Sequence, residues 1–284
     1  MKLTYYGTSG GQGLPGLFCA CDTCKRARER GGRNIMTRSQ ALVSADNGDT
    51  LLIDFPGDTN LHIHNYGLDL TNIGHCIVTH AHEDHFQPDD IAIRGGFSIV
   101  TPENVKKFHL YGSDVTGAKI AKMIENDTRE RYSFTAFEPY NTYDANGFRV
   151  TALAANHSKS LHSLNYIIER DGKSLLYATD TAYPDPEFFT FIEGLTDTKF
   201  DVVSLDCAWT NIPKHVEHMN IEDCTDVIRR LTAMGRTHKS TRFILTHFAH
   251  FGLIYDEIVD VCTELYRDTG IRIEVAYDGF FVKY

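Results

Sequence analysis

THAHEDHF, at residues 79–86, directly follows the short apolar run HCIVT. Four side chains that can bind metal stand in it at positions i, i+2, i+4 and i+5: His80, His82, Asp84 and His85. In a loop at the end of a strand, this spacing presents ligands to two ions. Imidazoles suit zinc, and a mixed set with carboxylates also accepts manganese or iron. A solvated histidine-rich turn would explain one of these residues but not all four, so the motif predicts a two-metal site.

Composition and charge place bounds on the class of protein. The chain has 284 residues, 42% of them hydrophobic, which is typical of an ordinary globular protein. Its formal charge of −10 argues against duplex nucleic acid as a partner, because such binding needs clustered Lys and Arg. The opening MKLTYYGTSGG has no cationic region followed by an apolar one, as a signal peptide would, and no apolar stretch approaches the roughly 20 residues that cross a bilayer. We therefore expect a cytoplasmic protein without a membrane partner.

Short apolar runs rich in β-forming residues recur along the chain and alternate with helix-like segments. The runs favour strands, and candidate helices lie at 23–30, 113–125, 186–194, 220–234 and 252–267. Asn220 is a good N-cap and Gly235 a good stop for one of them. The pattern predicts an α/β or α+β fold with large sheets. No Pro-, Gly- or Ser-rich linker interrupts it, so we expect one domain over residues 1–284.

Two pairs of segments echo each other weakly. TLLID at 50–54 is similar to SLLYATD at 174–180, and IVTH at 77–80 is similar to ILTH at 244–247. Each is an apolar strand that ends in a side chain able to bind metal. The echo predicts two similar halves whose strand ends meet at one site.

The THAHEDHF motif resembles that of the metallo-β-lactamase superfamily. The resemblance implies a four-layer αβ/βα sandwich of two mixed sheets flanked by helices, with a two-metal site between the halves. It also implies further ligands in a fixed order, which NHSKS, LLYATD and FILTH supply as His157, Asp180 and His247. By the same resemblance, His80, His82 and His157 hold one ion, Asp84, His85 and His247 hold the other, and Asp180 bridges them. Asp54 is expected to be either a hydrogen-bond partner of a ligand imidazole or a turn residue.

CACDTC at 19–24 gathers three of the seven cysteines, Cys19, Cys21 and Cys24. In a reducing compartment such a cluster favours metal binding over disulfides. Three thiolates leave a tetrahedral zinc one ligand short. The other four cysteines lie in apolar or helical contexts and are expected to be core residues.

A longer resemblance supplies that fourth ligand. GTSGGQGLPGLFCACDTCKRARE at 7–29, NHSK at 156–159, LTH-x-x-H at 245–250 and the late EVAYDGFFV resemble the PhnP family, phosphodiesterases of the carbon–phosphorus lyase pathway. The biosynthesis protein PqqB shares this kind of opening. In the PhnP family the cysteines bind a structural zinc together with a His three residues after the last catalytic His, which implies His250 here. GTSGGQG is not a P-loop, and its glycines are expected to turn the chain tightly beside the metal loops.

The resemblance implies a phosphodiesterase that hydrolyses a small, cyclic ribose phosphate or a 2′,3′-cyclic nucleotide through a metal-bridging hydroxide. The expected cofactors are two catalytic divalent metals, Mn or Zn, and one structural Zn. The expected catalytic residues are Asp84, which is also a ligand, and His218, the general acid, with His215 as its alternative. The rival functions are hydrolysis of a thioester or lactone, and a biosynthetic accessory role of the PqqB type. Residues 86–140 are candidates for specificity determinants or for a homodimer contact.

Overall fold

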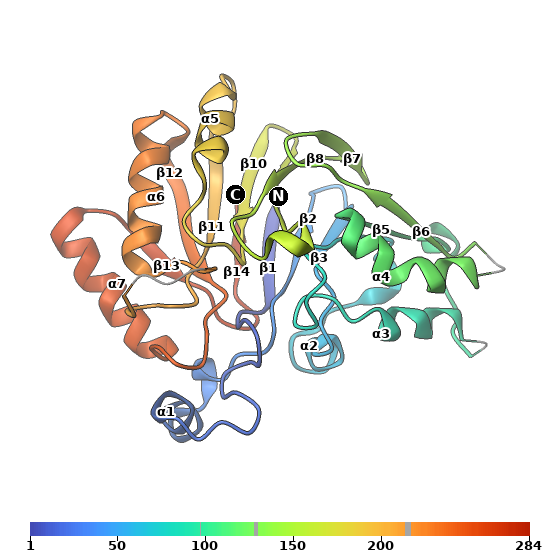
Figure 1. Ribbon diagram of the computed structural model, residues 1–284, viewed down its shortest axis with the longest axis horizontal. Coiled ribbons are helices and arrows are strands. Elements are labelled where there is room, and N and C mark those ends of the chain that lie inside the picture. The colour runs from blue at the N-terminus through green and yellow to red at the C-terminus, as the bar shows by residue number, and fades with distance from the viewer. Residues whose placement is uncertain (97, 128–129, 214–216) are drawn as a thin grey trace.

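The computed structural model describes residues 1–96, 98–127, 130–213 and 217–284. Within these ranges, two seven-stranded sheets lie face to face, and helices cover their outer faces (Figure 1). The predicted four-layer αβ/βα sandwich of two mixed sheets is confirmed.

The first sheet has the strand order β14-β1-β2-β3-β4-β5-β6. Strands β14, β1, β2 and β3 pair antiparallel, and β3 to β6 pair parallel. Its strands are β14 (Phe281–Lys283), β1 (Lys2–Gly7), β2 (Gln40–Ser44), β3 (Thr50–Ile53), β4 (His75–Ile77), β5 (Phe108–Gly112) and β6 (Tyr132–Ala136).

The second sheet has the order β13-β12-β11-β10-β9-β8-β7. Here β10 to β13 are parallel, and β7 to β10 are antiparallel. Its strands are β13 (Ile273–Val275), β12 (Thr237–Thr246), β11 (Phe200–Asp206), β10 (Lys173–Ala178), β9 (Leu164–Arg170), β8 (Phe148–Ala154) and β7 (Thr142–Ala145). Because neighbouring parallel strands end at the same edge, the residues that follow β10, β11 and β12 are brought together.

Helices α2, α3 and α4 lie beside the first sheet, and α5, α6 and α7 lie beside the second (Figure 1). The helices are α1 (Asp22–Arg30), α2 (Thr59–Tyr66), α3 (Pro88–Ala92), α4 (Asp114–Glu125), α5 (Pro186–Gly194), α6 (Ile221–Ala233) and α7 (Tyr255–Thr269). Asn220 caps α6 as expected, because its side chain accepts a hydrogen bond from the Asp223 backbone N–H at 2.8 Å. In the part of the chain that the structure describes, no helix is long and apolar enough to cross a membrane.

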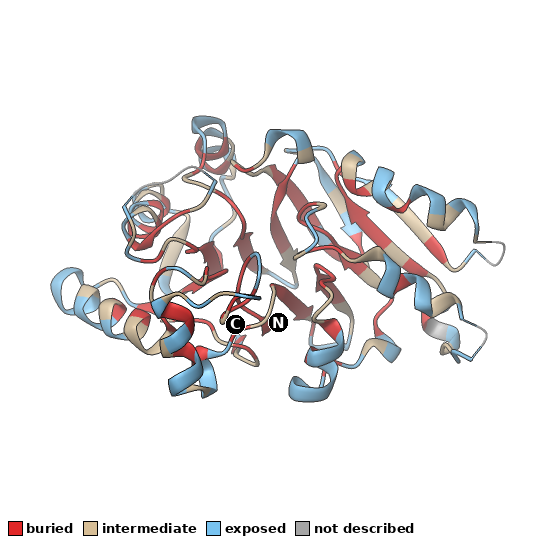
Figure 2. Ribbon diagram, turned by 60° about the horizontal axis from the view of Figure 1, so that its bottom comes forward, coloured by how far each residue is buried: buried red, intermediate tan, exposed pale blue. Residues whose placement is uncertain are grey.

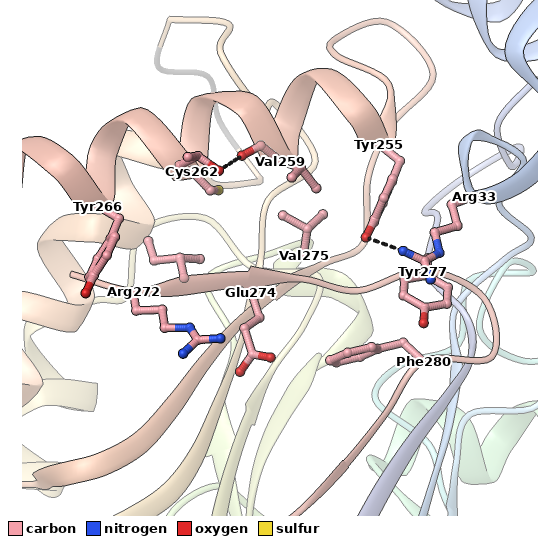
Figure 3. Close-up of a pocket in the computed structure, with 12 residues that line it drawn as sticks. Arg33, Tyr255, Val259, Cys262, Tyr266, Arg272, Glu274, Val275, Tyr277 and Phe280 are labelled. Carbon is pink, nitrogen blue, oxygen red and sulfur yellow. Dashed lines mark hydrogen bonds between the residues drawn. The ribbon is translucent and has the colours of Figure 1, made fainter. Parts of the chain in front are cut away.

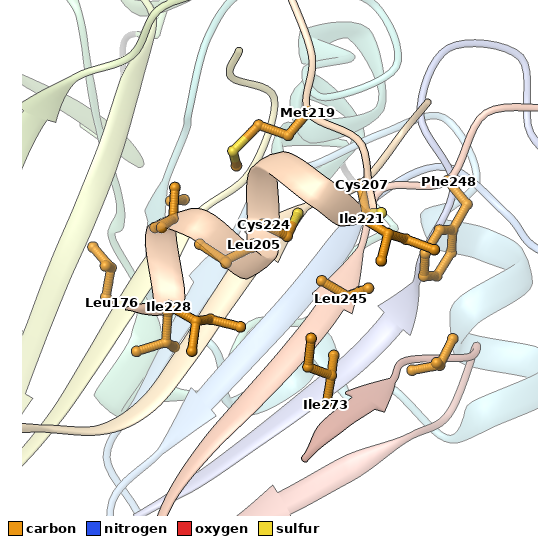
Figure 4. Close-up of a cluster of buried hydrophobic side chains, with 14 of the residues drawn as sticks. Leu176, Leu205, Cys207, Met219, Ile221, Cys224, Ile228, Leu245, Phe248 and Ile273 are labelled. Atoms are coloured by element: carbon orange, nitrogen blue, oxygen red, sulfur yellow. The ribbon is translucent and has the colours of Figure 1, made fainter. Parts of the chain in front are cut away.

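Three apolar layers follow from the alternation of side chains along the strands. In β3, Ile53 packs between the sheets, and its neighbour Leu52 packs towards α2–α4. In β10, Leu175 lies between the sheets and Leu176 lies under the helices of the other side. The strands are consequently buried while the helices expose their outer faces (Figure 2). Figure 4 shows Ile228, on α6, in the apolar layer between the second sheet and its helices, to which Leu176 also belongs.

Some elements differ from their sequence-based expectation. The C-terminal apolar stretch 273–284 forms two short strands in different sheets, β13 and β14, rather than one run. Between residues 86 and 140, β5, β6 and α3 form although their sequences show weak periodicity. Their burial depends on the neighbouring strand in the sheet, which a local pattern does not reveal.

Candidate metal centre

The predicted metal-ligating residues come together at the ends of strands from both sheets. Within the described residues, they form two groups whose ligand atoms all lie within 4.8 Å of one another, and Asp180 belongs to both. The groups are His80, His82, His157 and Asp180, and Asp84, His85, Asp180 and His247. Each group is the one that the resemblance implied, with Asp180 between them.

In the first group, imidazole nitrogens converge on one point. His80 Nε2 lies 2.8 Å from His82 Nδ1 and 3.1 Å from Asp180 Oδ2. His157 Nε2 lies 3.4 Å from His82 Nδ1. Burial lowers the pKa of His80 to about 4, so its ring is neutral at physiological pH, as a metal ligand must be.

In the second group, the tautomer of each histidine is set by a carboxylate on its far side. His85 Nδ1 lies 2.7 Å from Asp54 Oδ2, and His247 Nδ1 lies 2.9 Å from Asp206 Oδ2. The hydrogen bond keeps a proton on His85 Nδ1, and the nearby charge of Asp206 favours a proton on His247 Nδ1. The two Nε2 atoms then face each other at 3.0 Å. Asp54 thus lies where the sequence predicted a partner for a ligand imidazole.

The second group therefore fits a cation. Unless one of the two rings takes up an extra proton, the Nε2 lone pairs of His85 and His247 point at each other. Two carboxylate oxygens lie beside them: Asp84 Oδ2 and Asp180 Oδ2 are 3.4 and 3.2 Å from His85 Nε2. Burial lowers the pKa of His85, but Asp84 and Asp54 outweigh it and raise the pKa well above its ordinary value. So many acceptors pointing at one place require positive charge between them, which a divalent metal supplies.

The backbone is unusual where these ligands sit. Asp54, Asp180 and His247 all have positive φ, at 65°, 57° and 65°, which is uncommon for residues other than glycine. Gly10 lies against the ring of His247, because a Cβ on Gly10 would lie only 2.4 Å from His247 Cε1. The N-terminal glycines were expected to turn the chain tightly beside the metal loops, and Gly11 and Gly13 do have positive φ, at 56° and 78°. Gly10 in addition allows the backbone to approach His247 closely, and the Gly11 N–H donates to Asp84 Oδ2 at 2.6 Å.

His218 lies beside the ligands, as predicted, and contacts two carboxylates. Its Nδ1 lies 3.2 Å from Asp180 Oδ1 and 3.2 Å from Asp206 Oδ2. Burial lowers the pKa of His218, but Asp206 and Asp180 outweigh it and raise the pKa to about 9. The alternative acid, His215, and its neighbour Lys214 lie outside the described residues.

Asp206 is a site residue that the sequence analysis missed. It is fully buried, and it contacts both His218 and His247. With Asp180, His218 and His247 it forms a further group of potential ligands. The signal was present, because FDVVSLD is an apolar strand that ends in Asp, like TLLID and LLYATD.

The cysteines of CACDTC meet His250, as the resemblance implied. One ligand atom from each of Cys19, Cys21, Cys24 and His250 lies within 4.8 Å of the other three. Cys21 is the N-cap of α1, and the Cys24 N–H donates to its sulfur at 3.5 Å. Although burial opposes it, this bond and the contact with His250 lower the pKa of Cys21 to about 6. Three sulfurs and one imidazole form the donor set of a closed zinc site.

A surface cavity of about 450 Å³ lies away from these groups, between α7 and β13 (Figure 3). Arg33 stacks over the ring of Tyr277 at 4.0 Å and hydrogen-bonds the Tyr255 hydroxyl at 3.4 Å. None of the residues that line it belongs to a metal-ligand group. This cavity is therefore separate from the candidate metal centre at the strand ends.

The sequence matches a family model over most of its length. Residues 52–248 match the beta-lactamase superfamily domain, and the chain belongs to this family. Family membership and the His/Asp clusters together define the class: a metal-dependent hydrolase with the metallo-β-lactamase fold.

Solved structures of this fold match the whole chain. A new diphosphatase from the PhnP family has a TM-score of 0.74 at 20% identity, over 100% of this chain and 96% of that one. Zn²⁺-bound PqqB from Methylobacterium extorquens has a TM-score of 0.74 at 18% identity, over 100% of both chains. YhfI from Bacillus subtilis has a TM-score of 0.70 at 20% identity, over 99% of this chain and 98% of that one. No curated protein matches the sequence.

Proposed function

We propose that the protein is a metal-dependent phosphodiesterase acting on a small, cyclic ribose phosphate or a 2′,3′-cyclic nucleotide. The observation that supports this most is the position of His218, which is held by Asp180 and Asp206 beside the ligand groups. Hydrolysis of a diester needs a nucleophile, charge neutralisation, and a proton for the leaving alkoxide. Metals held by the two ligand groups would meet the first two needs, and His218 would meet the third.

Two divalent ions, manganese or zinc, would be held by the two ligand groups and would supply a water of lowered pKa and positive charge for the phosphoryl oxygens. The protein's own part is to fix the ligands. Asp54 orients His85, and Asp206 orients His247, through the ring nitrogen that faces away from the site. Lys119 holds the ligand loop by donating to the carbonyls of Ala81 and Phe86 at 2.8 and 3.0 Å.

His218 would protonate the leaving alkoxide. Both carboxylates face its Nδ1, so the proton that it offers to substrate is carried on Nε2. With a side chain 20% exposed, it is open to a ligand, whereas His85 and His80 are fully buried. A general acid at this place favours a substrate whose leaving group is poor, such as a ribose hydroxyl, because such a group must receive a proton as it leaves.

An aromatic wall of Trp209 and Phe251 favours a nucleotide over a bare sugar phosphate. The Trp209 ring lies 6.2 Å from His218 and 4.6 Å from Phe251, between ring centroids. Phe251 is 41% exposed. When the phosphate of a nucleotide lies at the metal groups, its base could stack on this wall. Such stacking contributes about 1–3 kcal/mol.

Replacing Phe251 with Ala should therefore raise KM for a 2′,3′-cyclic nucleotide by about tenfold, from the loss of stacking. The KM for a cyclic ribose phosphate without a base should stay the same. Phe281→Ala removes an equally exposed ring from β14 and serves as the matched control. Equal effects of Phe251→Ala on both substrates would reject the stacking role.

We also propose that Cys19, Cys21, Cys24 and His250 bind a structural zinc. This zinc would tie the start of α1 to the loop that follows His247, and so stiffen a ligand of the second group. Cys21→Ser should lower zinc content by one per chain and the unfolding midpoint by about 5 °C. Cys262→Ala, a buried cysteine in α7, is the control that should keep the zinc. Unchanged zinc in Cys21→Ser would contradict the assignment.

The proposed reaction is tested by a panel of substrates with manganese-loaded protein. A 2′,3′-cyclic nucleotide, a phosphomonoester, a nucleoside diphosphate, a lactone and a thioester would be compared, with His80→Ala as the blank. The diphosphate is included because a relative with the same fold is described as a diphosphatase. We expect metal-dependent opening of the cyclic diester. Activity confined to the thioester or lactone would favour the other hydrolase function, and none above the blank would favour a PqqB-like accessory role.

A further inference from the structure

A buried chain of polar side chains runs from Asp278, between β13 and β14, to Gln40 in β2. Asp278, His62 and Gln40 are buried, and Thr37 links the first two. Each contact in this chain lies between 2.6 and 2.7 Å. None of its members belongs to a ligand group.

The orientation of Gln40 fixes the first donor. Its Nε2 lies 3.0 Å from the Asp54 carbonyl oxygen, which can only accept. Nε2 also donates to the Thr59 hydroxyl, whose own proton goes to the Pro56 carbonyl. A flipped amide would set two oxygens against each other. Gln40 Oε1 therefore faces His62, and His62 Nδ1 must donate to it at 2.6 Å.

This direction carries through to Asp278. A neutral His62 with its proton on Nδ1 has a lone pair on Nε2, so the Thr37 hydroxyl donates to it at 2.7 Å. That hydroxyl has one proton only. Its 2.6 Å contact with Asp278 Oδ2 can then be a hydrogen bond only if Asp278 carries the proton.

The one alternative is a proton on His62 with an ionised Asp278. Burial of both groups opposes it. Burial lowers the pKa of His62 to about 4, and burial raises the pKa of Asp278 to about 7, although Thr37 and Thr8 hydrogen bonds oppose the rise. The charged and titratable groups that act on this pair include Tyr66, on α2, near Asp278, and the ion pair of Arg38 and Asp58, 2.8 Å apart, near His62.

Both ends of this hydrogen-bonded chain of side chains reach the second ligand group. At one end, Asp278 Oδ1 accepts from the Thr8 hydroxyl at 2.7 Å. Thr8 begins the loop in which Gly10 packs against His247 and Gly11 donates to Asp84. At the other end, Gln40 holds the backbone of Asp54, whose carboxylate orients His85.

We propose that Asp278 is a neutral carboxylic acid in the folded protein and acts, through Thr37, His62 and Gln40, as a positioning residue for Asp84, His85 and His247. His80, His82 and His157 make none of these contacts, and the link from Asp54 to the first group passes through the Thr79 hydroxyl, which donates to Asp54 and lies 3.1 Å from His80 Nδ1. The hydrogen-bonded chain thus acts mainly on the second metal-binding group.

Infrared spectroscopy of the protein without added metal tests the protonation directly. A protonated carboxyl group has a C=O stretch above the amide I band. This signal should be present in wild type at pH 6, absent in Asp278→Asn, and unchanged in Asp58→Asn, since Arg38 and its other donors lower the pKa of Asp58 against burial. Wild type and Asp278→Asn spectra that are identical in this region would overturn the proposal.

The pH dependence of unfolding gives a second measurement. A folded pKa raised from 3.8 to about 7 means that the carboxyl group favours the folded state most below pH 3.8. Its contribution is lost as the pH rises through 7. The unfolding midpoint of wild type should therefore fall relative to that of Asp278→Asn as the pH rises from 3.8 to 7. A difference that stays constant or rises over this pH range would mean an ionised Asp278 and would contradict the inference.

The positioning role is tested at Thr37 by manganese titration. Thr37→Val removes the hydroxyl that joins Asp278 to His62, and should weaken binding of one of the two ions by about tenfold. Thr37→Ser retains the hydroxyl and should restore it. The affinity for the other ion should stay the same in both variants. A Thr37→Val protein that binds both ions like wild type, or loses both equally, would reject the role.

Discussion

Replacing Asp180 with Asn should remove bound metal and reduce kcat by about a thousandfold or more, because several kcal/mol of charge stabilisation is lost. Asp180 is the one residue shared by both ligand groups. Its Oδ2 lies 3.1 Å from His80 Nε2 and 3.2 Å from His85 Nε2, one histidine from each group. Burial raises its pKa, but His247 and His80 outweigh burial and hold the pKa well below the usual range. The carboxylate is therefore ionised and available to two cations.

The Asn variant preserves shape and removes charge, so its effect reports on metal binding rather than packing. Metal content is measured together with the diester hydrolysis rate after reconstitution with manganese. Asp201→Asn is a matched control, since Asp201 is also buried but pairs with Lys173 at the far end of the second sheet. An Asp180→Asn protein that keeps both catalytic ions and wild-type turnover would show that Asp180 does not bridge them.

Replacing His218 with Gln should lower kcat for a 2′,3′-cyclic nucleotide by about 10²–10⁴, the usual contribution of a general acid. Metal content should not change, because the two groups remain complete without His218. The loss should be much smaller for bis(p-nitrophenyl) phosphate. Its leaving group is stable as an anion and needs no proton.

The comparison between the two substrates separates an acid from a ligand. His218 also lies in a group with Asp180, Asp206 and His247 that could itself hold an ion. If His218 is a ligand, His218→Gln loses metal and both substrates slow equally. His238→Gln, at the opposite end of the sheet beside Asp201, is the control and should behave like wild type.

The ligands were predictable because they are local. THAHEDHF carries four of them in one loop, and its resemblance to a known superfamily gives the order of His157, Asp180 and His247. Asp54 and the N-terminal glycines could be placed near the site because each follows a strand. The sequence alone did not single out Asp206, because an Asp at the end of a strand is common. Its role becomes visible only from its contacts with two histidines, His218 and His247.

The rest depends on contacts between distant segments. Asp278, His62 and the pair Thr37 and Gln40 come from three separate parts of the sequence, and no periodicity links them. The stretch YDGFFV in which Asp278 lies resembles a family pattern, yet the pattern does not say what the carboxyl group touches. Similarly, β5 pairs with β4 and β6 pairs with β5, and these neighbours in the sheet are far away in a local reading of the sequence.

Counting metal ions in wild-type protein tests the central claim most directly. Protein stripped of metal, reconstituted with zinc and manganese and freed of excess, would be measured by mass spectrometry of the elements. We predict three ions per chain, of which Asp180→Asn loses the catalytic pair and Cys21→Ser loses one zinc. A wild-type chain that retains no more than one ion, and loses it in Cys21→Ser, would contradict the two-metal site.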